Sequence, residues 1–301
     1  MPNTTASAAP QTKSPIDQLV HAIDTAGSPA CIGIDPVYSK LPRNLAALPE
    51  LEAIETFSLA ILDAIKESAS VVKPQSACFE RYGSKGYAIL EKVIAHARDL
   101  GLIVILDAKR GDIGSSATHY AVGAADMGAH FITVSPYMGP SSIEPFLDAG
   151  LGVFALARTS NPDSDRVQLQ ELHDGSCVAH GISSMIAEMG QSSLGERGLS
   201  NLGAVVGATK SAQDVQRLRT LMPNAMFLVP GVGAQGGTVE DVRPMTRTDA
   251  VGGPLSAGEL GVIVNASRSV IYPEPNAGES WQAAIGSAAG EFSVSLTKLT
   301  N

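Results

Sequence analysis

The sequence predicts an α/β fold, a (β/α)8 TIM barrel with an expanded loop after its fifth strand. Short apolar segments alternate along the chain with segments whose apolar residues recur at helical spacing, which is typical of parallel strands joined by helices. A length of 301 residues with 44% hydrophobic content suits one barrel of this kind. A doubly wound open sheet is the alternative, but such sheets rarely contain eight parallel strands without a recognisable second part.

The predicted strands are short runs rich in branched apolar residues, as expected for strands buried on both faces of a parallel sheet. They cover residues 30–34, 70–72, 102–106, 131–134, 152–156, 203–206, 226–229 and 261–264. Helices are predicted from apolar periodicity around residues 54–65, 90–97, 182–189, 215–221 and 281–299. Ser211 begins a start signal similar to a capping box, with Asp214 where Glu or Gln is usual. The long stretch 159–201 contains the expanded loop.

The chain is expected to form one barrel domain over residues 15–301, after a disordered tail over residues 1–14. The tail is small and polar and lacks the basic start and apolar centre of a secretory signal. A net charge of −9 argues against a nucleic-acid surface or a polybasic membrane patch. The three cysteines form no C-x-x-C pair, so reduced thiols in the cytoplasm fit best. No apolar stretch approaches the roughly 20 residues that span a bilayer.

Polar or charged residues follow every predicted strand except the sixth. They are Asp35, Lys73, Gln75, Asp107, Lys109, Asp112, Tyr137, Arg158, Thr159, Ser160, Gln235 and Arg268. Side chains at the carboxyl ends of barrel strands meet at one mouth, where enzymes of this fold carry out their chemistry. The distribution therefore favours a shared site over an isolated surface salt bridge.

The segment Asp107-Ala-Lys109-Arg-Gly-Asp112 follows the most apolar predicted strand. Unpaired charges are costly in apolar surroundings, so a carboxylate on each side of one ammonium would satisfy all three groups. Such an arrangement would also keep the lysine protonated, as a proton donor requires. A structural ion-pair cluster is the alternative for this motif taken alone.

A phosphate site is predicted after the seventh and eighth strands. The glycine-rich segment 230–237 offers accessible backbone N–H groups, and Arg268 can donate two parallel hydrogen bonds to a phosphate. The glycine spacing is not the G-x-G-x-x-G fingerprint of dinucleotide-binding folds.

These motifs together resemble the orotidine 5′-phosphate decarboxylase family, over residues 32–272 and in its longer bacterial branch. The motifs are the D-x-K-x-x-D segment, Lys73 upstream, and the glycine-rich segment with Arg268 downstream. The resemblance implies decarboxylation of orotidine 5′-monophosphate to uridine 5′-monophosphate and CO2 in de novo pyrimidine biosynthesis. It also implies no metal or organic cofactor, and a cytoplasmic homodimer with shared active sites.

The resemblance also implies roles for individual residues. Lys109 would protonate C6 as CO2 departs, Asp107 would lie against the substrate carboxylate, and Lys73 would hold the network and contact the ribose. The substrate-binding residues that it implies are Asp35 for a ribose hydroxyl, Ser160 for the pyrimidine edge with Thr159 as the open alternative, Gln235, Ser267 and Arg268 for phosphate, and Asp112 with Ile113 and Ser116 for the neighbouring subunit's site.

Two other enzyme classes and one non-catalytic function share parts of this pattern. A Mg²⁺-dependent sugar-phosphate decarboxylase or aldolase could use the same D-x-K-x-x-D frame, but Lys73 stands where an acidic ligand would be wanted. A Schiff-base aldolase needs an uncharged lysine, which flanking carboxylates disfavour. A non-catalytic nucleotide-binding protein is disfavoured by the intact motif.

Overall fold

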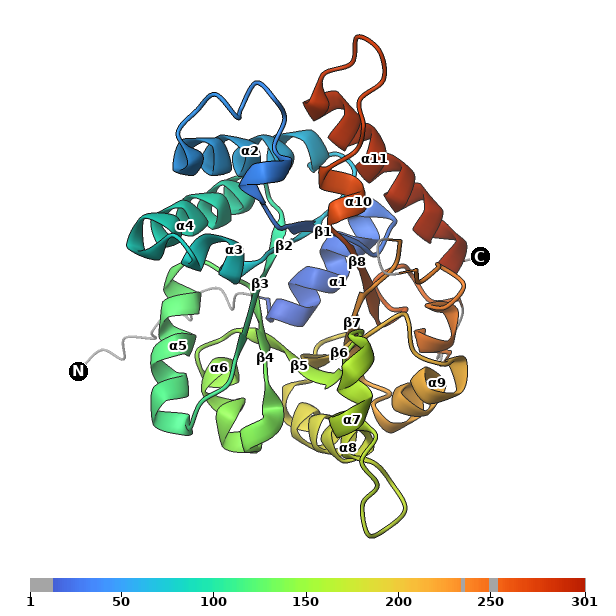
Figure 1. Ribbon diagram of the computed structural model, residues 1–301. Helices are drawn as coiled ribbons and strands as arrows, with labels where there is room; N and C mark the ends of the chain where they lie inside the picture. Colours follow the sequence, from blue (N-terminus) through green and yellow to red (C-terminus); the bar gives the residue numbers. More distant parts are fainter. Residues whose placement is uncertain (1–12, 234–235, 249–253, 301) are drawn as a thin grey trace, which may run out of the picture.

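The computed structural model describes residues 13–233, 236–248 and 254–300, and it is a closed barrel of eight parallel strands in chain order (Figure 1). The strands are β1 (Ala30–Ile34), β2 (Val71–Pro74), β3 (Ile103–Arg110), β4 (Phe131–Val134), β5 (Gly152–Arg158), β6 (Ser200–Val206), β7 (Ala225–Pro230) and β8 (Val262–Ala266). The predicted fold class is therefore confirmed. The first and fourth strands have the predicted bounds, whereas β3 continues to Arg110 and so includes Asp107 and Lys109.

Helices surround the barrel and alternate with its strands. They are α1 (Pro15–Ala26), α2 (Glu50–Ile65), α3 (Ser76–Glu80), α4 (Gly83–Asp99), α5 (Gly114–Asp126), α6 (Glu144–Asp148), α7 (Asp165–Gln168), α8 (Val178–Gly190), α9 (Ala212–Leu221), α10 (Arg268–Ile271) and α11 (Trp281–Leu296). None of the helices within the described ranges is both long enough and apolar enough to cross a membrane.

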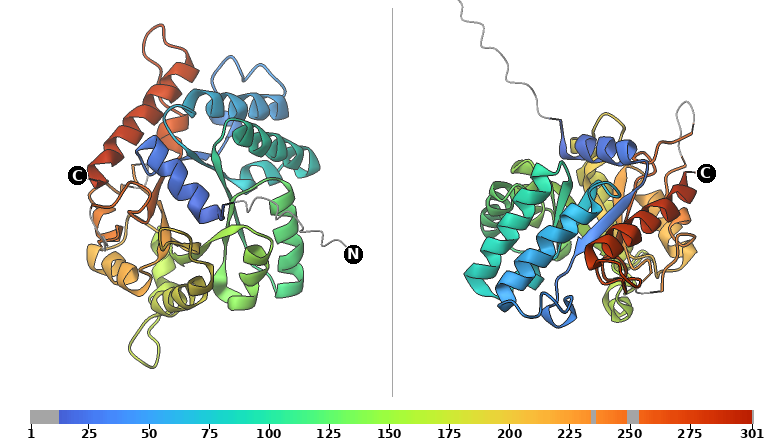
Figure 2. Two further views of the ribbon diagram at one scale, coloured as in Figure 1. Left: turned by 180° about the vertical axis from the view of Figure 1, so that it is seen from behind. Right: turned by 90° about the horizontal axis from the view of Figure 1, so that it is seen from above.

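Helix α1, which the sequence analysis did not predict, closes the amino-terminal end of the barrel. Ser14 caps it by accepting a hydrogen bond from the Asp17 N–H. Its buried apolar face belongs to one core cluster with side chains from all eight strands, and α1 contacts β2, β3 and β6 directly. Figure 2 shows α1 lying across this end in the view from behind. Ligands therefore reach the barrel from the opposite end, where the strands finish.

The predicted start of α9 forms only in part. Ser211 accepts a hydrogen bond from the Asp214 N–H, as a capping residue does. The carboxylate of Asp214 does not return to the cap but accepts a hydrogen bond from Arg158 at the end of β5. Asp214 therefore links α9 to the neighbouring strand rather than completing a capping box.

The loop between β5 and α8 is expanded, as predicted, and it contains short helices. Within it, Pro162–Ser164 form a 3-10 helix, and α7 follows directly at Asp165. A single antiparallel bridge between Glu171 and Cys177 closes the hairpin that follows. The predicted tail falls mostly on residues 1–12, which lie outside the described residues.

Candidate active site

A pocket of about 610 Å3 opens at the carboxyl ends of the strands. Its walls come from nearly every strand end of the barrel. The predicted site residues that line it are Asp35, Lys73, Asp107, Lys109, Ser160, Ser267 and Arg268, and Gln75, Thr133 and Thr159 line it as well. The fold therefore brings together residues that are far apart in the sequence, as the barrel prediction requires.

Asp107 is the centre of the polar network in this pocket. Its Oδ1 accepts hydrogen bonds from Lys109 Nζ at 2.5 Å and from Thr133 Oγ1 at 2.9 Å. Its Oδ2 accepts from Lys73 Nζ at 2.8 Å and from Gln75 Nε2 at 3.0 Å. Burial alone would raise the pKa of Asp107, but the two lysines outweigh it and hold that pKa well below its usual range. Asp107 is therefore a carboxylate at neutral pH.

Lys73 is the buried cation of the network. Burial would lower the pKa of Lys73, but the charges of Asp107 and Asp35 outweigh this effect and raise it. Lys73 therefore stays protonated between two acidic residues. An ammonium in this position disfavours a divalent cation, which would have to share the same carboxylates. Among the described residues, no group of three or more His, Cys, Asp or Glu side chains is placed to hold a metal ion.

Lys109 reaches into the pocket from a strained backbone. Its φ is 46°, and no other non-glycine residue in the described part of the chain has a positive φ. The strand register shifts between Leu106 and Arg110, and the Lys109 N–H donates to Thr133 Oγ1 at 2.9 Å. The side chain is 47% exposed, so a ligand can approach its ammonium group. Backbone strain of this kind is typical of residues that a site holds in one orientation.

Two carboxylates, Asp107 and Asp112, were predicted to flank the Lys109 ammonium group, and within the described chain Asp107 is the one that pairs with it. Asp107 pairs with Lys109, whereas the Asp112 carboxylate accepts a hydrogen bond from the Ile113 N–H at 2.8 Å. Strand β3 ends at Arg110, so Asp112 lies in the short segment between β3 and α5. Lys73 takes the second charged place beside Asp107.

Asp35 lines the pocket and has one carboxylate oxygen without a partner in the described part of the chain. Its Oδ1 is buried and has no hydrogen-bond partner among the described residues. A buried carboxylate oxygen without a donor is costly, so this position suits a ligand that brings a hydroxyl group. The backbone here is fixed by Tyr272, whose hydroxyl group donates to the Asp35 carbonyl oxygen at 3.2 Å.

Ser267 and Arg268 lie at the far side of the pocket, after β8. A Cβ at Gly33 would lie 1.9 Å from Ser267 Oγ, so only glycine leaves room for this serine beside β1. The Arg268 side chain is exposed, and its guanidinium group has no hydrogen bond or ion pair within the described ranges. The glycine-rich segment begins here with Gly231 and Gly233, both at positive φ. The predicted phosphate residue Gln235 lies outside the described residues.

Thr159 and Ser160 both line the pocket, but their hydroxyl groups differ. Thr159 Oγ1 donates to Asn161 Oδ1 at 2.6 Å and accepts from Gln168 Nε2 at 2.9 Å. The Ser160 hydroxyl group has no partner among the described residues, and only its carbonyl oxygen is bonded. Ser160 is therefore the freer of the two to meet a ligand.

Sequence reasoning missed Thr133 and Gly33. Thr133 is the one polar residue within the predicted strand 131–134, and this interruption of a buried strand was a usable signal. Gly33 gave no signal, because its role depends on the approach of Ser267 from the other end of the chain.

The fold and the site define a class of protein: a barrel enzyme with a lysine–carboxylate network in a pocket at the carboxyl ends of its strands. Residues 28–282 match the family model described as the orotidine 5′-phosphate decarboxylase / HUMPS family, and the chain belongs to this family. The resemblance noted in the sequence is thereby confirmed.

Individual relatives agree with this assignment. Orotidine 5′-phosphate decarboxylase of Rhodopirellula baltica is 38% identical over 93% of this chain and 97% of its own length. The Streptomyces coelicolor enzyme of the same name is 36% identical over 93% of this chain and 95% of its own length. The structure of Leishmania donovani OMP decarboxylase aligns with a TM-score of 0.75 and 28% identity, covering 95% of this chain and 98% of that one.

Proposed function

We propose that this protein decarboxylates orotidine 5′-monophosphate to uridine 5′-monophosphate and CO2, a step of de novo pyrimidine biosynthesis. The observation that carries the proposal is the Lys109 ammonium group, which is held on Asp107 and still open to the pocket. Family membership and the lysine–carboxylate network support the same reaction. The catalytic unit is one barrel domain over residues 15–301.

The chemistry follows from these two charges. The bond between C6 and the carboxylate carbon breaks, CO2 leaves, and the electron pair remains on C6. The Lys109 ammonium group stabilises that developing charge and then transfers its proton to C6. The resulting amine regains a proton from water, so no metal or organic cofactor is required.

Asp107 favours the departure of CO2 because it lies against the substrate carboxylate. Repulsion between the two carboxylates is relieved when the substrate loses its charge as CO2, and the two lysines keep Asp107 ionised for this role. The size of this ground-state contribution is set by how closely the two carboxylates approach each other.

The rest of the pocket orients the nucleotide. Asp35 accepts a hydrogen bond from a ribose hydroxyl group, and Lys73 contacts the ribose from the second strand end. Ser160 binds the pyrimidine edge through its free hydroxyl group. Phosphate is bound by Arg268, Ser267 and Gln235. Energy from phosphate binding, far from C6, can then be used to hold the reacting end in place.

We also propose a cytoplasmic homodimer in which Asp112, Ile113 and Ser116 of one subunit complete the site of the other. Ile113 is 60% exposed and Tyr137 is 86% exposed, which are large apolar surfaces for a single chain. The start of α5, which follows Ile113, packs beside Ser141 in the segment after β4 that also carries Tyr137. The free thiols of Cys31, Cys78 and Cys177 support a reducing compartment.

Mixing two inactive variants tests the dimer. Lys109→Ala and Asp112→Ala should each be nearly inactive. If they are unfolded and refolded together, about a quarter of the sites should be wild type, because one site of each hybrid carries both lesions and the other carries neither. No recovery despite confirmed heterodimers would place Asp112 in its own subunit's site.

The direct test of the reaction is to follow ultraviolet absorbance during incubation with orotidine 5′-monophosphate. Loss of substrate absorbance and formation of uridine 5′-monophosphate are expected, and both should survive exhaustive EDTA treatment. Activity that is lost on chelation and restored by Mg²⁺ would favour the sugar-phosphate class of enzyme instead.

A further inference from the structure

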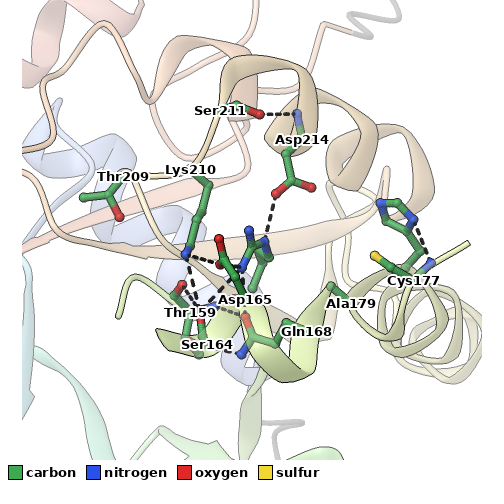
Figure 3. A network of polar contacts seen from close by, with 12 residues as sticks. Thr159, Ser164, Asp165, Gln168, Cys177, Ala179, Thr209, Lys210, Ser211 and Asp214 are labelled. Atoms are coloured by element: carbon green, nitrogen blue, oxygen red, sulfur yellow. Dashed lines mark hydrogen bonds and ion pairs between the residues drawn. The ribbon is translucent and has the colours of Figure 1, made fainter. Parts of the chain in front are cut away.

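Arg158, the last residue of β5, lies at the centre of a charged cluster that the proposed chemistry does not use. It is 3% exposed. Its Nε donates to Asp214 Oδ2 at 2.8 Å, and its Nη1 donates to Asp165 Oδ1 at 2.6 Å. The same Nη1 lies 3.4 Å from Gln168 Oε1. Figure 3 shows Asp214 reaching this cluster from one helix, α9, and Asp165 and Gln168 from another, α7.

Lys210 brings a second cation to the same loop. Its Nζ donates to Asp165 Oδ1 at 2.9 Å and to Ser164 Oγ at 3.3 Å, although its side chain is only 7% exposed (Figure 3). Hydrogen bonds from Arg158 and Lys210 lower the pKa of Asp165 to about 2. Asp165 is therefore a carboxylate shared by two cations, one from β5 and one from the segment after β6.

The cluster is connected to the residues that face the substrate. Gln168 Oε1 accepts from the Thr159 N–H at 3.0 Å, and Gln168 Nε2 donates to Thr159 Oγ1 at 2.9 Å. Thr209 Oγ1 donates to the Ser160 carbonyl oxygen at 3.2 Å. A Cβ at Gly207 would lie 2.7 Å from Ser160 Cα, so only glycine allows the end of β6 to approach this closely.

The segment of residues 159–168, here called the covering loop, has open space on both of its sides. Ser160 and Asn161 line the active-site pocket and also a second cavity of about 990 Å3 behind the loop. Val167 is exposed and lines the active-site pocket. A wall between two cavities has few packing contacts, so its position depends on the polar bonds that hold it.

We propose that Arg158 and Lys210 are positioning residues that hold the covering loop in its binding position before substrate arrives, with Asp165 as their common partner. Neither cation needs to touch the nucleotide for this role. Ser160 is placed by the loop, and the loop is placed by the two cations. The identity of the substrate rests on the proposed function, whereas the anchoring rests on the contacts above.

The consequence for catalysis is a specific change in kinetics. If the anchors are lost, the covering loop occupies its binding position for a smaller fraction of the time. The apparent affinity for substrate falls by that fraction, because binding must then also order the loop. Once substrate has bound, the loop is held by its contacts with the nucleotide, and the chemical step proceeds at nearly its normal rate.

The test is Asp165→Asn, which removes the shared charge and keeps the shape of the side chain. KM for orotidine 5′-monophosphate should rise on the order of tenfold, in proportion to the lost population of the held loop, while kcat stays within about twofold. The matched control is Asp174→Asn, which neutralises a carboxylate of the same expanded loop that accepts only from its local neighbour Ser176. Its kinetics should match the wild type. A lower kcat at unchanged KM would indicate a smaller folded fraction and overturn the proposal.

Hydrogen exchange separates this proposal from the proposed function. In substrate-free protein, the backbone amides of residues 159–168 should exchange faster in Asp165→Asn and in Lys210→Met than in the wild type or in Asp174→Asn. Unchanged exchange in both variants overturns the anchoring, whether or not the wild type decarboxylates the nucleotide. A wild type that leaves orotidine 5′-monophosphate intact refutes the proposed function, and the exchange experiment still decides the anchoring.

Discussion

The two ends of the barrel each contain a buried arginine, and the two arginines are satisfied in opposite ways. At the open end, Arg158 donates to the carboxylates of Asp165 and Asp214. At the closed end, Arg219 donates only to backbone carbonyl oxygens, and its guanidinium stacks over the Phe227 ring at 3.6 Å. The carbonyl partners of Arg219 belong to Met222, Ala225, Met245 and Gly261.

The two sets of partners predict different mobility at the two ends of the barrel: fixed backbone at the closed end, and a loop that can change position at the open end. The carbonyl groups of Ala225 and Gly261 lie at the starts of β7 and β8, where the sheet fixes them. Arg219 therefore links segments that the sheet already holds in place. Burial lowers the pKa of Arg219 to about 9, with a further contribution from the charge of Arg247. Arg158 instead joins α9, through Asp214, to the covering loop, through Asp165, and such side-chain ion pairs can be released and formed again without disturbing the sheet.

The largest effect is expected at the open end, for removal of the Lys109 ammonium group. Lys109→Ala should lower kcat by roughly 10²-fold to 10⁴-fold or more, because it removes the proposed proton donor and the charge proposed to stabilise the carbanion. The temperature of unfolding should change little, since the side chain is half exposed. Steady-state kinetics and a thermal melt measure both. Lys85→Ala, on the surface of α4, is the control and should keep the wild-type kcat. A similar loss of kcat in this variant would show that the effect is not specific to Lys109.

A smaller effect at the same end is expected for the phosphate contact. Arg268→Ala should weaken transition-state binding of the nucleotide by about 2–5 kcal/mol, the scale for truncating a charged hydrogen bond. The nucleoside orotidine, which has no phosphate, should be far less sensitive. Comparison of kcat/KM for the two substrates is the measurement. Equal losses for both would show that Arg268 does not bind phosphate.

At the closed end, the comparison predicts loss of stability without a change in substrate binding. Leu19→Ala leaves a cavity between α1 and the barrel interior and should lower the free energy of unfolding by about 2–5 kcal/mol. KM should stay at the wild-type value in the folded protein. Urea unfolding and kinetics at low temperature test this pair of results. Val294→Ala, an exposed position on α11, should cost no more than about 0.5 kcal/mol.

The smallest effect concerns pH, at the start of β4. His130 Nδ1 accepts from the Val104 N–H at 3.0 Å, which requires an unprotonated nitrogen, and burial together with the charge of Arg98 lowers the pKa of His130 to about 4. The unfolded chain takes up a proton near the ordinary histidine value of about 6.5. Stability should therefore fall as the pH decreases from about 7 to about 4.

His130→Asn isolates this contribution from the carboxylates that titrate in the same range. Its side-chain oxygen can accept from the Val104 N–H but does not titrate. The difference in free energy of unfolding between variant and wild type should shift in favour of the variant as the pH falls toward 4. A difference that stays constant between pH 7 and pH 4 contradicts the assignment.

The sequence was informative wherever local pattern decides the outcome. Buried strands are continuous apolar runs, so the barrel and the residues after each strand could be predicted. The lysine–carboxylate pair was also accessible, because Asp107 and Lys109 are neighbours in the chain. The amphipathic spacing of α1 was present in the sequence too, but its place across the end of the barrel depends on closure of all the strands.

Features that depend on long-range approach could not be predicted. The hydrogen bond from Thr133 to Asp107 and the strained φ of Lys109 arise only when β3 and β4 pair with a shifted register. Arg158 was visible at a strand end, yet its partner Asp214 had been interpreted as part of a helix cap. The preference for Ser160 over Thr159 required the positions of both hydroxyl groups.

The closure of the barrel by α1 has a consequence for substrate entry and product release. Packed apolar side chains fill the amino-terminal end of the barrel, and within the described part of the chain the pocket opens at the end where the strands finish. Substrate, nucleotide product and CO2 therefore enter and leave through the same opening of the pocket. Uridine 5′-monophosphate has to leave the pocket before the next substrate can bind. The rate of product release therefore sets an upper limit on kcat.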